Sequence, residues 1–282
     1  MIVVGVDGSM AARAAVEWAA GDALRAHVPL RVVHAVDRSP YQIDRFGPAD
    51  RPDAPTREGR RALDEALALA RERQPGVEVT TALVEGSPDV VLREEAVRAD
   101  ELVVGSRGLG GLTGALLGSV SAHLAGRVAC PVVAVRAERH PVRGEVAVGV
   151  DDSPGCEAAL EYAFAQARLR GAALRVVHAW QLPVHAFAPE ISYEMDQVRA
   201  AQHEAVVGRL AAFERRHPGV RVVEDAPCRQ PVDALTAASA GADLLVVGSH
   251  GRGAVGAALL GSVSRGVLHH ARCAVAVVRH HT

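Results

Sequence analysis

The sequence contains the same long pattern twice, once in each half of the chain. The recurring segments are Val4–Ser9 with Val148–Ser153, Arg31–Ala35 with Arg175–Ala179, and Gly105–Ser121 with Gly248–Ser264. The third pair has 11 of 17 positions identical, and the offsets of 144, 144 and 143 residues mean that the copies differ by one net residue. A period this long indicates two tandem domains, because the repeats of solenoid proteins run about 20–50 residues.

Length and composition are compatible with two such domains. The 282 residues allow each domain to bury a core of its own. A hydrophobic content of 49% and a net charge of −2 are typical of a soluble globular protein. No apolar run approaches the ~18 residues that a membrane span needs. The N-terminus begins directly with a predicted strand and shows no secretory leader, so we expect a cytoplasmic protein.

Missing residue types exclude several functions. All 31 basic residues are arginine, which excludes a Walker-type phosphate lysine and a Schiff-base lysine. With 3% aromatic residues and no basic stripe, the chain offers no platform for nucleic acid, and we expect no nucleic-acid partner. The cysteines show no C-x-x-C spacing. Cys130 and Cys273 occupy equivalent positions before apolar strands, which favours buried packing over metal or redox chemistry.

Short β-branched apolar runs alternate with helical periodicity in each copy. In the first copy the predicted strands are Ile2–Val6, Leu30–Val36, Val77–Val84, Glu101–Val104 and Val132–Val135. Such runs are typical of strands buried on both faces of a parallel sheet, and the helices between them imply right-handed crossovers. The sequence therefore predicts an α/β fold of two tandem doubly wound domains, 1–137 and 144–282, each with a five-stranded mainly parallel sheet flanked by helices.

Serine precedes the first helix of each copy. Ser9 and Ser153 are predicted N-caps, and Pro154 would take the first helical position of the second copy. The loops after the second strand, at 37–55 and 181–193, differ most between the copies. Loops of this length are usually lids, partner surfaces or disordered segments, and the sequence leaves these alternatives open.

A glycine pattern follows the fourth strand of each copy with identical spacing. It reads Gly105-x-x-Gly108, nine residues, Gly118-Ser119, and then Gly248-x-x-Gly251, nine residues, Gly261-Ser262. Glycine lets backbone N–H groups approach a ligand closely, and the N-terminus of the helix that follows favours an anion. The serines that add hydroxyl donors are Ser119, Ser121, Ser262 and Ser264. The pattern predicts a phosphate site in each copy.

Acidic residues are absent around both glycine patterns. There is none from Leu102 to Arg136 and none from Leu244 to the C-terminus, while each window carries several arginines. A polyphosphate site favours such a charge pattern, although one glycine pattern alone also occurs as a simple turn. Gly251–Gly256 fits the dinucleotide pattern G-x-G-x-x-G, but that fingerprint needs a later carboxylate and the chain has none. We therefore exclude a nicotinamide dinucleotide.

In a doubly wound sheet the ligand lies beyond the carboxyl ends of the strands, where the strand order reverses. The end of the first strand, with Gly5 and Asp7, is then expected beside the glycine pattern, where Asp7 would accept from ribose hydroxyls or a purine amine. The alternative role of Asp7 is to cap the first helix, which Ser9 already does. His34 and His178 are predicted to be satisfied core histidines within the second strand.

These features together resemble the universal stress protein family in its tandem, nucleotide-binding form. The family's signature, G-x2-G-x9-G-[S/T], occurs twice here, and Asp7 and Asp151 match its strand-one aspartate. The resemblance covers nearly the whole chain. It implies one ATP site in each domain, with Mg²⁺ arriving with the phosphates, and a nucleotide-dependent regulator of stress or growth state that is at most a slow ATPase.

The resemblance also implies the residues of each site, with no catalytic or metal-binding residue among them. The first site would consist of Gly5, Asp7, Ala35, Val104, Gly105, Ser106, Arg107, Gly108, Leu109, Gly110, Gly111, Gly118, Ser119, Val120 and Ser121. The second would consist of Gly149, Asp151, Ala179, Val247, Gly248, Ser249, His250, Gly251, Arg252, Gly253, Ala254, Gly261, Ser262, Val263 and Ser264. We expect glutamate at Gly105 or Gly248 to weaken ATP binding and leave the fold intact.

Two other classes of function remain alternatives. An ATP pyrophosphatase or adenylating enzyme on a related α/β fold would usually carry a phosphate-binding Ser/Gly signature after the first strand, where this chain has only Asp-Gly-Ser and Asp-Asp-Ser. A scaffold without nucleotide is the third reading, and the intact glycine signatures argue against it.

The resemblance further implies pairing through the fifth strands, since family members pair there. Val132–Val135 and Ala274–Val278 would then pair within one molecule as a pseudo-dimer. Homodimerisation and an additional protein partner are left open.

Overall fold

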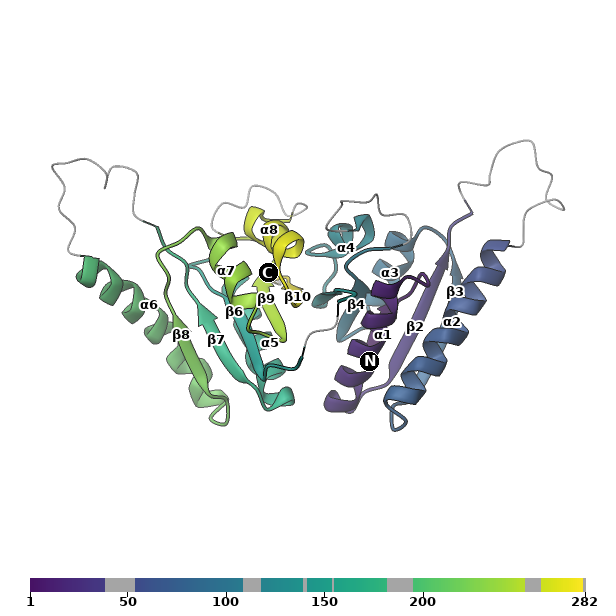
Figure 1. Cartoon of the computed structure of the whole chain (residues 1–282), viewed down its shortest axis with the longest axis horizontal. Coiled ribbons are helices and arrows are strands. Elements are labelled where there is room, and N and C mark those ends of the chain that lie inside the picture. The colour runs from purple at the N-terminus through teal and green to yellow at the C-terminus, as the bar shows by residue number, and fades with distance from the viewer. Residues whose placement is uncertain are drawn as a thin grey trace. The chain divides into compact units, whose positions relative to one another are not determined.

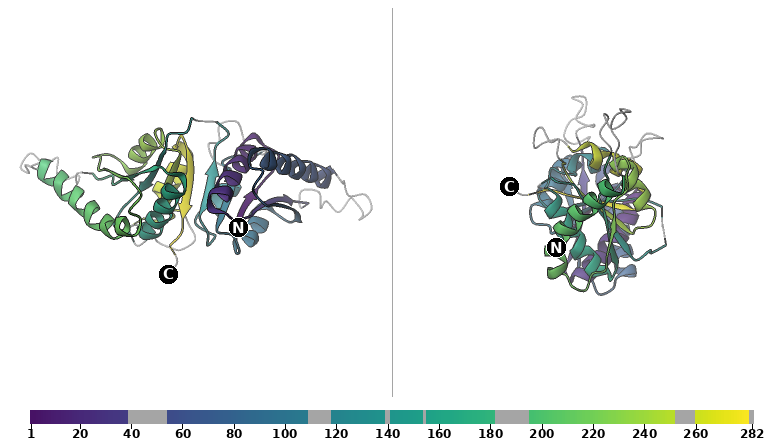
Figure 2. Two further views of the ribbon diagram at one scale, coloured as in Figure 1. Left: turned by 90° about the horizontal axis from the view of Figure 1, so that it is seen from below. Right: turned by 90° about the vertical axis from the view of Figure 1, so that its left-hand side faces the viewer.

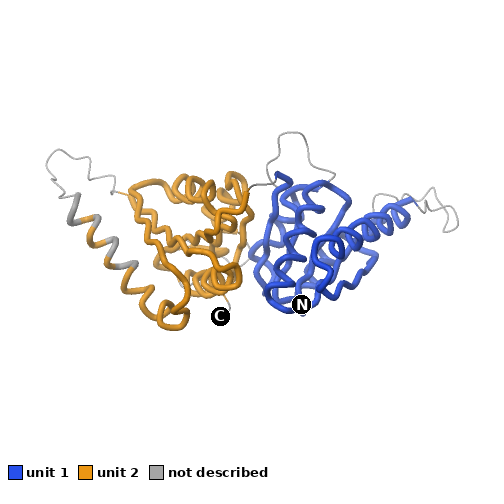
Figure 3. Tube along the Cα trace, turned by 60° about the horizontal axis from the view of Figure 1, so that its bottom comes forward, with its two compact units in different colours: residues 1–139 blue, residues 140–282 orange. Residues whose placement is uncertain are grey.

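A computed structural model describes residues 1–38, 54–108, 118–138, 141–153, 155–181, 195–251 and 260–280. The chain divides into two compact units, Met1–Arg139 and His140–Thr282 (Figure 3). Each unit repeats the same succession of strands and helices (Figure 1).

The first unit alternates strands with helices along its whole length. Its elements are β1 (Ile2–Gly5), α1 (Met10–Ala26), β2 (Leu30–Val36), α2 (Ala54–Arg73), β3 (Val79–Glu85), α3 (Pro88–Ala96), β4 (Glu101–Gly105), α4 (Ser119–Leu124) and β5 (Val132–Val135). The predicted strands are all present. The first ends one residue earlier than predicted and the third begins two residues later, at Val79.

The second unit has the same order of elements. They are β6 (Glu145–Gly149), α5 (Gly155–Arg170), β7 (Ala173–Val177), α6 (Met195–Arg216), β8 (Val222–Asp225), α7 (Pro231–Ser239), β9 (Leu244–Gly248), α8 (Ser262–His270) and β10 (Ala274–Val278).

Each unit is built on a parallel sheet. The described strands follow the order β3-β2-β1-β4-β5 in the first unit and β8-β7-β6-β9-β10 in the second. The strand order reverses beside β1, which pairs with both β2 and β4, and beside β6, which pairs with both β7 and β9. The predicted α/β class, with a parallel sheet flanked by helices, is confirmed. A doubly wound sheet of this order offers its ligand site at the point of reversal.

Helices cover the sheet of each unit on both faces (Figure 2). In the first unit α1 packs with α2, and α3 packs with α4. Right-handed crossovers account for this division, because the chain moves one way across the sheet through α1 and α2 and the other way through α3 and α4. The strands are consequently buried on both sides: Val3, Val4, Leu102 and Val103 are all completely buried.

The first helix shows how the sequence pattern becomes a buried face. Ser9 caps α1, since its hydroxyl oxygen accepts from the backbone N–H of Ala12 at 3.1 Å, as predicted. The small residues Val16, Ala19 and Ala20 are completely buried against the sheet. Small side chains allow the helix to approach β4 closely. The glycine pattern begins at Gly105, the last residue of that strand, so the helix limits the space there.

Candidate functional site

The glycine pattern of the first domain is closed at its base by backbone hydrogen bonds. The N–H of Ser106 donates to the carbonyl of Val135 at 2.7 Å, and the N–H of Gly118 donates to the carbonyl of Ser106 at 2.7 Å. The first bond continues the sheet beyond β4, and the second joins the two ends of the loop. The loop therefore leaves and re-enters the fold at one point, the carboxyl end of β4.

The second domain closes its glycine pattern in the same way. The N–H of Ser249 donates to the carbonyl of Val278 at 2.8 Å, and the N–H of Gly261 donates to the carbonyl of Ser249 at 2.9 Å. The loop interiors, 109–117 and 252–259, lie outside the described residues. The predicted site residues that fall there are Leu109, Gly110, Gly111, Arg252, Gly253 and Ala254.

The helices that follow begin where the glycine pattern predicts. Gly118 is the N-cap of α4 and Gly261 is the N-cap of α8. The side chains of Ser119 and Ser262, at the first helical positions, are exposed at the loop.

Ser121 and Ser264 have a structural use that the sequence did not predict. The hydroxyl of Ser121 donates to the carbonyl of Gly105 at 2.7 Å, and that of Ser264 donates to the carbonyl of Gly248 at 2.7 Å. Both side chains are buried. A hydroxyl has one proton to donate, so these two serines tie the helix to the strand end instead of offering a donor to a phosphate.

The Asp7 carboxylate lies directly against the glycine pattern. One oxygen, Oδ1, accepts from the N–H of Ser9 at 2.9 Å. The other, Oδ2, would be 2.5 Å from a Cβ atom placed on Gly108, so a side chain at residue 108 would displace the carboxylate. The end of strand one and the glycine loop after strand four therefore meet at one point, as expected for a site at the strand reversal.

Asp151 repeats this arrangement in the second domain. Its Oδ1 accepts from the N–H of Ser153 at 3.0 Å and from the Ser153 hydroxyl at 2.5 Å. A Cβ atom on Gly251 would be 2.9 Å from Asp151 Oδ2. Ser153 thus donates its hydroxyl to the aspartate, and the capping role expected for its oxygen stays a prediction. Helix α5 begins at Gly155, and Pro154 lies outside the described residues.

Two glycines of the predicted sites are explained by packing within the fold. A Cβ atom on Gly105 would be 2.9 Å from the backbone of Ala11 and Ala12 in α1. A Cβ atom on Gly5 would be 2.7 Å from the side chain of Leu92 in α3. The missing side chains at these positions admit helices, so glutamate at Gly105 would have to displace the backbone of α1, against the expectation that it leaves the fold intact.

The equivalent positions of the second domain are less crowded. A Cβ atom on Gly248 would meet its nearest neighbour, the carbonyl oxygen of Gly155, at 3.4 Å. On Gly149 the nearest atoms belong to Leu235, at 3.0 Å. Gly248 therefore has space for a small side chain where Gly105 has none.

The remaining predicted residues lie at or near the strand ends or in the helices that follow the glycine patterns. Val104 and Val247 are buried at the ends of β4 and β9. Ser106 and Ser249 are also buried, whereas Arg107 is exposed. The others, all partly buried, are Ala35, Ala179, Val120 and Val263.

His250 carries a buried polar atom without a protein partner in the part of the chain that the structure describes. Its Nδ1 is 2.9 Å from the hydroxyl of Ser249, and its Nε2 is buried and has no hydrogen-bond partner there. Buried polar atoms are seldom left unpaired, because the lost hydration costs about 1–3 kcal/mol. A ligand oxygen beside the glycine loop would satisfy this atom.

The two core histidines bind the ends of the first strands. His34 Nδ1 donates to the carbonyl of Val6 at 2.8 Å, and His178 Nδ1 donates to the carbonyl of Val150 at 3.3 Å. Both are satisfied, as predicted. His34 lies within β2, but His178 follows β7 by one residue, so the prediction that both lie within the strand is wrong for His178.

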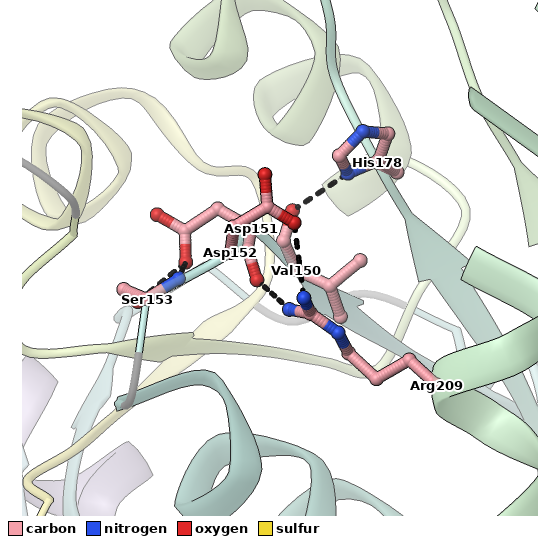
Figure 4. Close-up of polar contacts among 6 residues, drawn as sticks. All are labelled: Val150, Asp151, Asp152, Ser153, His178 and Arg209. Atoms are coloured by element: carbon pink, nitrogen blue, oxygen red, sulfur yellow. Dashed lines mark hydrogen bonds and ion pairs between the residues drawn. The ribbon is translucent and has the colours of Figure 1, made fainter. Parts of the chain in front are cut away.

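Arg209 is a site residue that sequence reasoning missed. It extends from α6 to the loop after β6, where its guanidinium donates to the carbonyl of Asp151 and pairs with the Asp152 carboxylate at 2.9 Å (Figure 4). Beneath it, Asp152 and His178 help to line a cavity of about 10 Å³, which is room for one water molecule. The available signal was a joint difference between the copies: Arg209 and Asp152 stand where the first copy has Ala66 and Gly8.

The two cysteines that precede the last strand of each domain lie where the sequence predicts. Cys130 and Cys273 are buried, and burial raises the pKa of the Cys130 thiol to about 12. Cys156 is buried as well, and burial raises its pKa, while Cys228 is exposed. A thiol with a raised pKa is a weak nucleophile near neutral pH, which supports the packing role predicted for Cys130.

No helix among the described residues has the length and apolar character needed to cross a membrane. No group of three or more His, Cys, Asp or Glu side chains among them has the geometry to hold a metal ion.

Comparisons with known proteins agree with the duplication. The family model described as the universal stress protein family matches residues 1–136 and again 143–279. The chain is 38% identical to Universal stress protein Rv2005c of Mycobacterium tuberculosis, over 99% of this chain and 96% of that protein. It is 36% identical to Universal stress protein Rv2623 of the same organism, over 99% of this chain and 96% of that protein.

A solved structure is similar over the same extent. The crystal structure of a universal stress protein from Archaeoglobus fulgidus matches with a TM-score of 0.69 and covers 99% of this chain and 96% of its own. At 21% sequence identity this likeness concerns the fold alone.

Proposed function

The chain belongs to the universal stress protein family, and from that premise we propose that each of its two domains binds one ATP at the carboxyl end of its sheet. The observation that carries the proposal is the contact between the strand-one aspartate and the glycine pattern, present in both domains. Asp7 faces Gly108, and Asp151 faces Gly251, each so closely that a side chain on the glycine would displace the carboxylate.

This geometry suits a nucleotide for two reasons. A carboxylate at the strand end is an acceptor for ribose hydroxyls or a purine amine, and the glycine backbone beside it leaves N–H groups accessible to phosphate oxygens. The glycine loop itself contains no acidic residue, so it places no repelling carboxylate beside a polyphosphate. The buried Nε2 of His250 adds a group that needs a partner.

We propose a regulatory role for the bound nucleotide. The protein would report or control a stress or growth state through its occupancy by ATP, acting in the cytoplasm. Mg²⁺ would accompany the phosphates, and hydrolysis, if it occurs, would be slow. An ATP pyrophosphatase or adenylating enzyme remains the alternative, and steady turnover of ATP to pyrophosphate would favour it.

Calorimetric titration tests the proposal. Nucleotide-stripped protein is expected to bind ATP with a stoichiometry near two and micromolar affinity, about −8 kcal/mol per site. ADP and AMP titrations would show how much the outer phosphates contribute. The absence of heat with all three nucleotides, under conditions where the protein is folded, would end the nucleotide hypothesis.

We further propose that the two domains pair through their fifth strands. β5 and β10 each end the strand order of their own sheet, and an unpaired apolar edge favours association. The half-chain Met1–Glu138, expressed alone, is then expected to self-associate in place of its missing partner. Sedimentation equilibrium measures this, and a half-chain that stays monomeric at high concentration would refute the pairing.

A further inference from the structure

The two proposed sites differ at one residue pair. Gly8 and Ala66 of the first copy correspond to Asp152 and Arg209 of the second. The first correspondence follows from the aligned strand ends. The second follows from the segment after the helix, which reads QPGV from Gln74 and HPGV from His217, an offset of 143 residues. The second domain has thus replaced two small residues by an ion pair.

The ion pair lies at the proposed site itself. Figure 4 shows the Arg209 guanidinium lying across the loop that carries Asp151. One nitrogen donates to the Asp151 carbonyl, and the other pairs with Asp152 Oδ1 at 2.9 Å. The Arg209 side chain is 32% exposed and that of Asp152 is 55% exposed, so neither group has paid a full desolvation cost. The ion pair therefore restrains the loop and costs the folded domain little desolvation free energy.

Arg209 completes a set of bonds that restrains the loop from several sides. The preceding carbonyl, that of Val150, accepts from His178, and the Asp151 carboxylate accepts from the N–H and the hydroxyl of Ser153. Consecutive carbonyls are thus held by side chains from different elements. The carboxylate oxygen that remains, Oδ2, faces Gly251.

The first domain lacks the arginine. Its Val6 carbonyl accepts from His34, as in the second domain, and Ala66, at the position of Arg209, has no side-chain donor. Gly8 follows Asp7 with a φ of +83°, a conformation that glycine adopts readily, and glycine has more conformational freedom to lose than the aspartate of the second copy. Asp152 has no such positive φ, so the two loops also differ in backbone conformation.

We propose that Arg209 is a positioning residue that makes the second nucleotide site tighter than the first. The inference rests on the proposed function, since it assigns unequal affinities to the two ATP sites. Arg209 acts through Asp151, whose backbone it holds in place before the nucleotide arrives, so less conformational freedom is lost on binding. It also balances the charge of Asp152, which would otherwise add a second negative charge near the phosphates.

The test reads each site separately in the full-length chain. Glutamate at Gly108 disables the first site, so that calorimetry with ATP reports the second alone. Glutamate at Gly251 gives the converse. We expect the second site to bind ATP about tenfold more tightly than the first, and Arg209→Ala to remove about that factor from the second site only.

Three further variants identify the cause. Asp152→Gly combined with Arg209→Ala recreates the first copy and should give the second site the affinity of the first. Arg209→Lys keeps the charge but loses the two-nitrogen contact, so an intermediate affinity is expected. Arg216→Ala is the matched control, because it removes an ion pair with Glu161 from the same helix, away from the loop.

The results of these titrations separate the positioning role of Arg209 from ATP binding itself. Equal affinities in the wild-type sites, or an Arg209→Ala effect no larger than that of Arg216→Ala, would overturn the positioning role while leaving ATP binding in place. Absence of ATP binding in the wild-type chain would overturn the proposed function, and this inference with it. Thermal unfolding of the nucleotide-free variants shows whether each of them is folded. If Arg209→Ala is unfolded, Arg209→Lys tests the positioning role, and wild-type affinity at its second site would overturn that role.

Discussion

Glutamate at Gly108 or at Gly251 is expected to abolish ATP binding in the domain that carries it and to leave the other domain's site intact. A Cβ atom at these positions would be 2.5 Å from Asp7 Oδ2 and 2.9 Å from Asp151 Oδ2, so each aspartate must leave its place. The new carboxylate then faces both the aspartate and the phosphates. Two like charges about 4 Å apart repel by roughly 4 kcal/mol at an effective dielectric constant of 20, so a loss of at least about 100-fold is expected.

Calorimetry measures this as a fall in stoichiometry from two to one. The fold should survive, because neither glycine has the positive φ that excludes a side chain. Gly219→Glu is the matched control, since Gly219 is exposed and a side chain there would meet nothing within 4 Å. Two full sites in either glutamate variant would mean that the phosphates bind elsewhere.

Gly105→Glu is expected to act on stability first. A side chain at residue 105 would push against the backbone of Ala11 and Ala12, and a helix backbone cannot rotate out of the way as a side chain can. Overpacking of this kind typically costs about 1–3 kcal/mol, and a charge buried beside α1 adds to it. The first domain should therefore unfold at a lower denaturant concentration than the second.

The second copy supplies the comparison for this prediction. Gly248→Ala places a methyl group 3.4 Å from its nearest neighbour and should cost less than about 1 kcal/mol, while Gly105→Ala should cost more. Denaturant unfolding of the two alanine variants measures the difference. Equal costs would show that α1 can move away from β4, contrary to the packing described above.

The sequence predicted the fold well because its signals were local and repeated. Alternating β-branched runs and helical stripes locate the strands, and their alternation with helices indicates a doubly wound parallel sheet. Ser9 was identifiable as a cap because an N-cap depends on the residues beside it in the chain. Ser153 has the equivalent position in the second copy, and its hydroxyl donates to Asp151, two residues before it.

The candidate site was predictable in its position but not in its detail. The closeness of Asp7 to Gly108 follows from the rule that ligand sites of doubly wound sheets lie at the strand reversal. The reason for a glycine at residue 105 depends on how closely α1 approaches β4, which the sequence does not show. The sequence could not predict the hydrogen bonds of the buried Ser121 and Ser264 hydroxyls either. A serine hydroxyl can donate to a ligand or to a backbone carbonyl, and the residue type does not distinguish the two. Arg209 is 58 residues from Asp151 in the chain, and only the fold brings the two together.

A crystal structure grown with a non-hydrolysable ATP analogue is the most direct test of whether each domain binds ATP at the carboxyl end of its sheet. Two nucleotides are predicted per chain, one per domain, with the ribose or base within hydrogen-bond distance of Asp7 and Asp151. The phosphates should lie on the backbone N–H groups that follow Gly105 and Gly248. Nucleotide bound away from these strand ends, or a single nucleotide shared by the whole chain, would contradict the account.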